Sequence, residues 1–355
     1  MTITNSMIRD NGQSTEANGG IVNLGAITVT DSVIDHNGSI GIQNISETAI
    51  IARSTISCNV SGGLTNGNGL VRLSGTAVVA NGTTARNSIG SIGNVLGTVE
   101  LTGSTVMSNS ATDGGGINNN GDLSLSASAV VSNSATGDGG GIYSNGSEFH
   151  GLLTLDYSTI SGNNAGLDGG GVMNDGGVFT TTATTVGYNR TVNNTSVGTG
   201  GGGIENRGTG ALIDSTVVGN DNSQGDSGGI ENTSGALALT NTDILSNTAS
   251  QGGGIWNVPG STLIATGGTV TGNSANGYGG GIKNAATMAL IGHRCRAIHG
   301  HTRDASNVSS ANQHSFTNTC ATRGHDPLLC RRGGDGDGTH HPGAAQPCPT
   351  GQRCV

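Results

Sequence analysis

Residues 104–119 read STVMSNSATDGGGINN, and this stretch contains the two turn motifs that decide the fold. The first motif places an Ile or Val three residues before an Asn, here Val106 and Asn109. The second motif is GGGI-x-N, here with Ile117 and Asn119. Both motifs return at intervals of about 26 residues, and a fixed period of this size is typical of solenoids and related repeat folds.

The first motif recurs eleven times with the same spacing between the aliphatic residue and the Asn. Its Asn residues are Asn11, Asn37, Asn59, Asn81, Asn109, Asn133, Asn163, Asn189, Asn220, Asn247 and Asn273. The second motif gives a parallel series in which only Ser144 replaces the Asn. Its Asn residues are Asn23, Asn44, Asn66, Asn94, Asn119, Asn174, Asn206, Asn232, Asn257 and Asn284. The two series together mark one turn each in every repeat.

Short segments of alternating apolar and polar residues complete each repeat, for example DLSLSAS at 122–128 and ALALTNT at 236–242. A period of two is that of a β-strand with one buried face. No segment keeps the apolar spacing of a helix, and glycine is too frequent for one. We therefore predict an all-β protein, a parallel β-helix solenoid of about eleven coils with three short strands per coil. The handedness preference of parallel crossovers indicates right-handed winding.

The composition fits such a fold and argues against several classes of function. Of the 355 residues 66 are Gly, only 10% are charged, and the formal net charge is −9. Nothing in this acidic chain attracts phosphate backbones, so we expect no nucleic-acid binding. No apolar run approaches the ~20 residues that span a bilayer, so we expect no membrane insertion by the chain itself. The start, MTITNSMIRDNGQ, lacks the basic and apolar regions of a signal peptide.

The fixed residues have architectural roles in this prediction. The Ile and Val columns form an aliphatic stack inside the solenoid. Each fixed Asn is expected to occupy the left-handed position of its turn and to hydrogen bond its own backbone. Its amide is also expected to bond the Asn one coil above and below. The ladder residues that we single out are Asn109, Asn133, Asn163, Asn220, Asn247 and Asn273 at the first turn, and Asn174, Asn206, Asn232, Asn257 and Asn284 at the second.

The motifs STISGN (158–163), GGGI-x-N and LTL (153–155) resemble those of the right-handed β-helix repeat proteins of bacterial cell surfaces, within the pectate-lyase-like superfamily. The chain is also similar to the polymorphic outer membrane protein repeats, whose hallmark pairs are GGA(I/V/L) and F-x-x-N. It departs from them in having GGGI for GGAI and Ile or Val in place of Phe. The resemblance covers residues 1–291 and implies export and display in the cell envelope or outer membrane. Proteins with this fold include enzymes, adhesins and passive stalks.

The pattern stops near Gly292, and residues 292–355 form a tail of different composition. Three interpretations are open: a Cys/His metal module, a disulfide-bonded cap of an exported protein, and loss of the reading frame near Gly292. The Cys and His residues in question are Cys295, Cys320, Cys330, Cys348, Cys354, His340 and His341. We favour frame loss, because Arg, His, Cys and Pro rise abruptly while zinc sites usually show a C-x-x-C spacing that is absent here. The tail is expected to be mostly disordered.

The residues that directly follow the GGGI aliphatic are expected to point outward in one column. The members that could bind a glycan are Tyr143, Glu205, Glu231, Trp256 and Lys283. Glu205 and Glu231 fall on adjacent coils, so one of the two carboxyls should be protonated or share a cation. Acid pairs beside an exposed aromatic such as Trp256 are typical of sugar sites. The alternative is that these surface residues vary freely.

A second column precedes the glycines and consists of Asp113, Asp138, Asp168 and Asp226. Aligned carboxylates at a turn could hold Ca²⁺, whereas a structural role in capping the turn is the alternative. The nonapeptide calcium signature of β-helix repeats is absent. We therefore expect no cofactor, with Ca²⁺ at these four residues as the one open case.

These observations favour an exported, surface-displayed structural or adhesive β-helix protein without catalytic activity. Its expected partners are surface glycans or proteins of a host or neighbouring cell. The alternative is a polysaccharide-binding or polysaccharide-cleaving β-helix protein, a lyase or hydrolase that uses the outer face around Glu205, Glu231 and Trp256. No Ser-His-Asp or Cys-His arrangement can be argued, so no catalytic residue is assigned.

Overall fold

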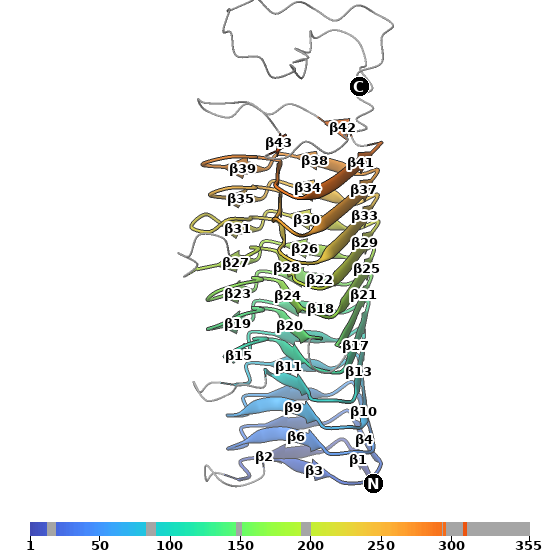
Figure 1. Cartoon of the computed structure of the whole chain (residues 1–355). Coiled ribbons are helices and arrows are strands. Elements are labelled where there is room, and N and C mark those ends of the chain that lie inside the picture. The colour runs from blue at the N-terminus through green and yellow to red at the C-terminus, as the bar shows by residue number, and fades with distance from the viewer. Residues whose placement is uncertain are drawn as a thin grey trace, which may run out of the picture.

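A computed structural model of the chain describes residues 1–12, 19–82, 90–146, 151–192 and 200–292, together with the backbone of Arg294–Cys295 and Val308–Ser310. Figure 1 shows the described part as a stack of coils whose strands lie side by side in columns. All the described elements are strands, and every pairing between them is parallel in register. The predicted all-β parallel solenoid is therefore confirmed. In the described residues there is no helix that could cross a membrane.

Three long sheets run the length of the solenoid, and each holds twelve strands because each coil contributes one strand to each sheet. Sheet A consists of β1 (Thr2–Thr4), β4 (Ile27–Thr30), β7 (Thr48–Ala52), β10 (Leu70–Ser74), β13 (Thr98–Thr102), β17 (Asp122–Ser126), β21 (Leu152–Asp156), β25 (Val178–Thr182), β29 (Thr209–Ile213), β33 (Ala236–Thr240), β37 (Thr262–Thr266) and β41 (Thr287–Ile291). Sheet B consists of β2 (Met7–Arg9), β5 (Val33–Asp35), β8 (Thr55–Ser57), β11 (Ala77–Val79), β14 (Thr105–Met107), β18 (Ala129–Val131), β22 (Thr159–Ser161), β26 (Thr185–Gly187), β30 (Thr216–Val218), β34 (Asp243–Leu245), β38 (Thr269–Thr271) and β42 (Arg294–Cys295).

Sheet C contains the GGGI-x-N strands and turns its inner side to the same core. It consists of β3 (Ile21–Asn23), β6 (Ile40–Asn44), β9 (Gly62–Asn66), β12 (Ile92–Asn94), β16 (Ile117–Asn119), β20 (Ile142–Asn145), β24 (Val172–Asp175), β28 (Ile204–Asn206), β32 (Ile230–Asn232), β36 (Ile255–Asn257), β40 (Ile282–Asn284) and β43 (Val308–Ser310). The twelfth coil takes β42 and β43 from the segment predicted to be a disordered tail, and these two strands continue sheets B and C. The rest of that segment lies outside the described residues, as do its Cys and His residues beyond Cys295.

A fourth, seven-stranded sheet was not predicted from the sequence. Sheet D lies between sheets B and C in seven of the coils, and its two-residue strands are β15 (Ser110–Ala111), β19 (Ser134–Ala135), β23 (Asn164–Ala165), β27 (Arg190–Thr191), β31 (Asp221–Asn222), β35 (Thr248–Ala249) and β39 (Ser274–Ala275). Figure 1 shows it as a ridge that stands apart from sheet A on the opposite side of the solenoid. Each strand follows the first fixed Asn directly, so these coils have four strands rather than the predicted three.

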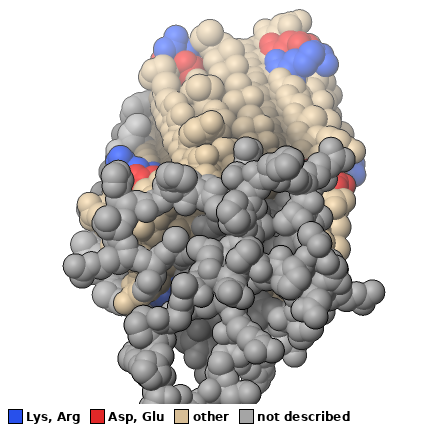
Figure 2. Space-filling model, turned by 90° about the horizontal axis from the view of Figure 1, so that it is seen from above, with Lys and Arg blue, Asp and Glu red and all other residues tan. Residues whose placement is uncertain are grey.

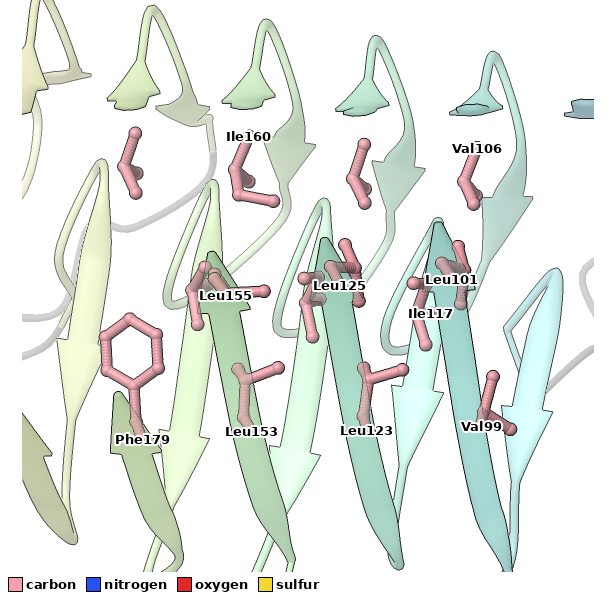
Figure 3. Close-up of a cluster of buried hydrophobic side chains, with 14 of the residues drawn as sticks. Val99, Leu101, Val106, Ile117, Leu123, Leu125, Leu153, Leu155, Ile160 and Phe179 are labelled. Atoms are coloured by element: carbon pink, nitrogen blue, oxygen red, sulfur yellow. The ribbon is translucent and has the colours of Figure 1, made fainter. Parts of the chain in front are cut away.

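The core is a thin stack of aliphatic side chains, as Figure 3 shows for the coils from Val99 to Phe179. The column of sheet B is buried from Ile34 to Ile244, with Val106, Val130 and Ile160 one above the other. Sheet A contributes two inward side chains per strand, such as Leu153 and Leu155. Small branched side chains suit this interior because each coil must fill the same cross-section as its neighbours.

The first series of Asn residues forms a continuous hydrogen-bonded ladder. The Nδ2 group of Asn109 donates to Oδ1 of Asn133 at 2.9 Å, and that of Asn133 donates to Oδ1 of Asn163 at 3.0 Å. The same Oδ1 atoms also accept from the backbone N–H of the preceding coil's Asn, at 3.0 and 2.9 Å. The ladder continues through Asn189, Asn220, Asn247 and Asn273.

The second series makes an equivalent ladder at the other turn. Asn206 Nδ2 donates to Asn232 Oδ1 at 2.8 Å, and Asn232 Nδ2 donates to Asn257 Oδ1 at 2.9 Å. Asn174 and Asn284 belong to the same ladder. These turns are therefore tied together by side chains that are themselves buried.

The expected left-handed backbone at the fixed Asn residues is wrong for both series, and at the first turn it is shifted by one residue. The left-handed residue is the one that precedes the Asn, as at Ser108 and Ser132, both with φ of 55°. The Asn itself turns inward, where its amide is needed by the next coil. The left-handed backbone conformation and its energetic cost therefore fall on an outward residue. The buried Asn keeps an ordinary backbone conformation.

Candidate functional site

The outward residues of sheet C form one column in register across six coils. The column, which we call the covered column, consists of Tyr143, Met173, Glu205, Glu231, Trp256 and Lys283. Its predicted exposure is wrong at the centre, because Glu205 and Glu231 are 0% exposed and Trp256 is 7% exposed. Tyr143 and Lys283, near its ends, are half-buried. The structure therefore brings the five predicted residues together, but as an enclosed strip rather than an open face.

The glycine segments cover this strip. The chain between sheet D and sheet C folds back so that the first glycine of GGGI lies on the column residue four positions later. A Cβ atom on Gly252, whose φ is +53°, would lie only 2.8 Å from the Cβ of Trp256. At Gly201 the backbone N–H donates to Oε2 of Glu205 at 3.2 Å. Glycine is needed here for close approach of the backbone to the column, which the motif alone did not indicate.

Glu205 is fully buried but has several polar neighbours. Its Oε1 accepts a hydrogen bond from the hydroxyl of Thr233 and lies 3.4 Å from Nε of Arg207. Burial raises the pKa of Glu205 to about 8, with the negative charge of Asp168 adding to the effect and the hydrogen bond from Thr233 opposing it. Burial therefore favours the protonated form of Glu205.

Arg207 is the positive centre of the strip. Its Nη2 lies 2.5 Å from Oδ2 of Asp168, and its Nη1 lies 3.9 Å from Oδ1 of Asp175. The hydroxyl of Tyr143 donates to Oδ2 of Asp175 at 3.0 Å, which links the aromatic end of the column to the same group. Burial and the nearby carboxylate of Asp175 raise the pKa of Tyr143. No motif in the sequence singled out Arg207.

Glu231 differs from Glu205 in its lack of polar neighbours within hydrogen-bond distance. Both of its carboxylate oxygens are buried and have no hydrogen-bond partner in the described part of the chain, and the same holds for Nε1 of Trp256. Glu231 pairs in register with Glu205 on one side and with Trp256 on the other. Burial, followed by the negative charge of Glu205, raises its pKa well above the ordinary value. The predicted protonation of one carboxyl in the pair agrees in direction with both pKa shifts.

Lys283 closes the far end of the column. Its Nζ lies 3.6 Å from the centroid of the Trp256 ring, the arrangement of a cation–π contact. Nζ also donates to Oε1 of Gln251, whose Nε2 donates to Oδ1 of Asp226 at 3.2 Å. Burial lowers the pKa of Lys283, and the charges of Asp226 and Glu231 oppose this.

The Asp column acts within the turns. Oδ1 of Asp113 accepts from the backbone N–H of Asp138 at 2.9 Å, and Oδ1 of Asp138 accepts from that of Asp168 at 3.0 Å. Burial raises the pKa of Asp138 to about 6, and the hydrogen bond from the backbone N–H of Asp168 opposes this rise. No three His, Cys, Asp or Glu side chains of residues 1–292 that the structure describes converge as metal ligands do. Asp113 and Asp138 thus link the turn of one coil to the turn of the next, and Asp226 instead accepts from Gln251.

Comparison with known proteins gives no further assignment. No protein-family model matches the chain, and no curated protein and no solved structure matches it. The site must therefore be interpreted from its own geometry.

Proposed function

We propose that this chain is a structural or adhesive solenoid displayed at the bacterial cell surface, without catalytic activity. The observation that supports the proposal is the closure of the covered column. Glu205 and Glu231 carry the carboxyl groups best suited to act on a sugar, and both residues are 0% exposed. A substrate could not reach them without displacement of the glycine segments, whose backbones are hydrogen bonded from coil to coil.

The open surface supports the same proposal. Figure 2 shows Lys, Arg, Asp and Glu in a few small groups on a surface that is otherwise uncharged where it is described. On sheet A, the outward positions of the strands from β25 to β41 hold only Thr, Ala, Ile and Val. Such regular and uncharged faces suit a spacer or contact surface, whereas active sites concentrate polar groups in accessible clefts.

Surface display is tested with antibodies raised against the full chain. Intact cells of the native bacterium should be labelled as strongly as permeabilised cells. Beads coated with the full chain should also adhere to cells or extracellular matrix more than beads coated with albumin. Labelling that requires permeabilisation would overturn the surface location, and adhesion equal to albumin would leave the structural role alone.

The second candidate is a glycan-cleaving enzyme, which is favoured by one observation. Glu205 has a pKa of about 8 and lies beside Arg207, as a general acid with a neighbouring cation would. The test incubates the full chain with polygalacturonate, xylan and β-glucan and measures new reducing ends and unsaturated products. We expect none. Cleavage that is lost in a folded Glu205→Gln variant would establish the enzyme instead.

A further inference from the structure

At two corners of the solenoid, every coil whose corner the structure describes has a left-handed residue. The first corner, between sheets A and B, includes Asp31, Arg53 and Asn241, and the second, between sheets B and C or D, includes His36 and Ser132. Left-handed backbone costs a residue with a Cβ roughly 1–2 kcal/mol, and Gly, Asn and Asp tolerate it best. Most occupants of the two corners are Gly, Ala, Ser, Asn or Asp, as this cost predicts.

The larger occupants with charge have local partners. Arg53 pairs with Asp31 of the preceding coil at 2.7 Å. His36 Nδ1 lies 2.8 Å from Oδ2 of Asp35. An interaction is therefore present wherever a long polar side chain is held in this conformation.

Tyr157 and Tyr188 are the exceptions. Their φ angles are 50° and 58°, and their side chains are 70% and 67% exposed. Neither side chain makes a hydrogen bond or ion pair with the described residues. Strained, exposed aromatic residues whose hydroxyls bind nothing among the described residues point to a role outside the fold.

The two rings lie at opposite edges of one small area of sheet B. Tyr157 stands just before β22 and Tyr188 just after β26, and these strands are neighbours, with Thr159 paired to Thr185. Five residue positions therefore separate the backbones of the two tyrosines along the strand direction, roughly 15 Å at the rise of a β-strand. That is the length of a short oligosaccharide.

The floor between the rings is small and uncharged. Its outward residues are Thr159, Ser161, Thr185 and Gly187. Gly187 adds no side chain to this floor and is itself buried beside Val218 of the next coil. The Tyr188 ring leans over the next coil, where a Cβ on Gly219 would lie 2.8 Å from its Cε1 atom.

We infer that Tyr157, Tyr188 and the hydroxyl-bearing floor between them bind a neutral polysaccharide chain. The chain would lie diagonally across the neighbouring strands β22 and β26. Aromatic faces stack on the apolar faces of sugar rings, and the Thr and Ser hydroxyls meet sugar hydroxyls. A neutral polysaccharide fits better than an acidic one, because the floor has no charge and the protein is net acidic. The inference rests on the proposed adhesive role and assigns it to a site remote from the covered column.

The test is native electrophoresis of the full chain through gels that contain hydroxyethylcellulose, mixed-linkage β-glucan, galactomannan or polygalacturonate. We expect retardation in at least one neutral gel and none in polygalacturonate. Tyr157→Asn and Tyr188→Ser should each weaken the apparent affinity roughly tenfold, the loss typical of an interface anchor. Asn and Ser already occupy equivalent corner positions at Asn241 and Ser132, so both variants should fold.

Tyr278→Ser is the matched control, because Tyr278 is 67% exposed and has ordinary backbone. It should migrate as the unmodified chain does. The inference is overturned by free migration in every neutral gel, by unchanged retardation of the Tyr157/Tyr188 double variant, or by equal loss in the Tyr278→Ser control. Because purified protein is used, a failure here is separate from a failure of surface display.

Discussion

Ser144 interrupts an otherwise regular amide ladder at the second turn. Asn119 Nδ2 donates to the Ser144 hydroxyl at 3.1 Å, but the buried Oδ1 of Asn174 in the next coil has no partner. We predict that Ser144→Asn restores both bonds and raises the free energy of unfolding by about 1 kcal/mol. Urea unfolding measures it, and a loss of stability would show that the coil has no room for the larger side chain.

Asn163 represents the opposite case, a complete ladder position. Its side chain accepts from Asn133 and donates to the carbonyl of Val130 and to Asn189, at 2.9–3.0 Å. Asn163→Ala should lower the free energy of unfolding by about 3 kcal/mol, because buried donors and acceptors lose partners on both sides. Exposed Asn68 supplies the control, for which replacement by Ala should cost less than about 0.5 kcal/mol.

The sequence predicted which residues repeat but not always what each repeat does. Spacing placed the aliphatic residue and the Asn correctly in the core and at the turn, because both must recur for coils to stack. It could not locate the left-handed position one residue earlier, where Ser108, Ala80 and Tyr188 share no side-chain property. A backbone requirement that many side chains tolerate leaves little trace in one sequence.

At the scale of elements, sheet D was missed because its strands are two residues long. A signal was present: a buried small residue follows the first fixed Asn by two positions, as at Ala111, Ala135 and Ala165. The burial of the covered column was missed for a related reason. Alternation assigns Glu205 to the outer side of sheet C correctly, but it does not reveal that the glycine segment before the strand returns to cover that side.

The carboxyl pair of the covered column should make stability depend on pH. Folded Glu205 and Glu231 bind protons more tightly than the unfolded chain does, so their contribution is complete below about pH 4.5 and is lost as pH rises through their folded pKa values. The loss is about 1.4 kcal/mol per pH unit for one carboxyl. Melting temperature should therefore fall between about pH 5 and pH 8.

Glu231→Gln tests this dependence directly. The amide cannot ionise, and it forfeits no hydrogen bond because Glu231 makes none with the described residues. We expect the variant to be more stable than the unmodified chain at pH 8 and to melt with a shallower pH dependence. Glu47→Gln, at an exposed position, should leave the profile unchanged. Parallel profiles for Glu231→Gln and the unmodified chain would refute the assignment.

At the scale of the whole molecule, each coil contacts mainly its two neighbours. Stability should then be a sum of coil and neighbour terms, and an entire coil should be removable. Deletion of residues 216–242 joins Ser215 to Asp243, which pairs in register with Thr216. We predict a folded solenoid that is shorter by about 4.8 Å, one strand spacing.

Small-angle scattering and circular dichroism measure the length and the strand content of that variant. Deletion of residues 216–229 alone removes about half a coil and is the control. This deletion joins Ser215, which precedes a sheet B strand, directly to Ile230 of a sheet C strand. It should therefore disrupt the stack from that coil onward. Equal behaviour of the two deletions would contradict a coil-by-coil fold.

The Asn ladders also give the solenoid an electrical direction. In both ladders the Nδ2 group of one coil donates to the Oδ1 of the following coil, from Asn37 to Asn59 and from Asn206 to Asn232 alike. The amide dipoles are therefore aligned, with their positive ends toward the higher-numbered coils, and neighbouring members polarise one another. Two such rods could join their ladders head to tail but never head to head, so the molecule has a polarity comparable to that of a filament subunit.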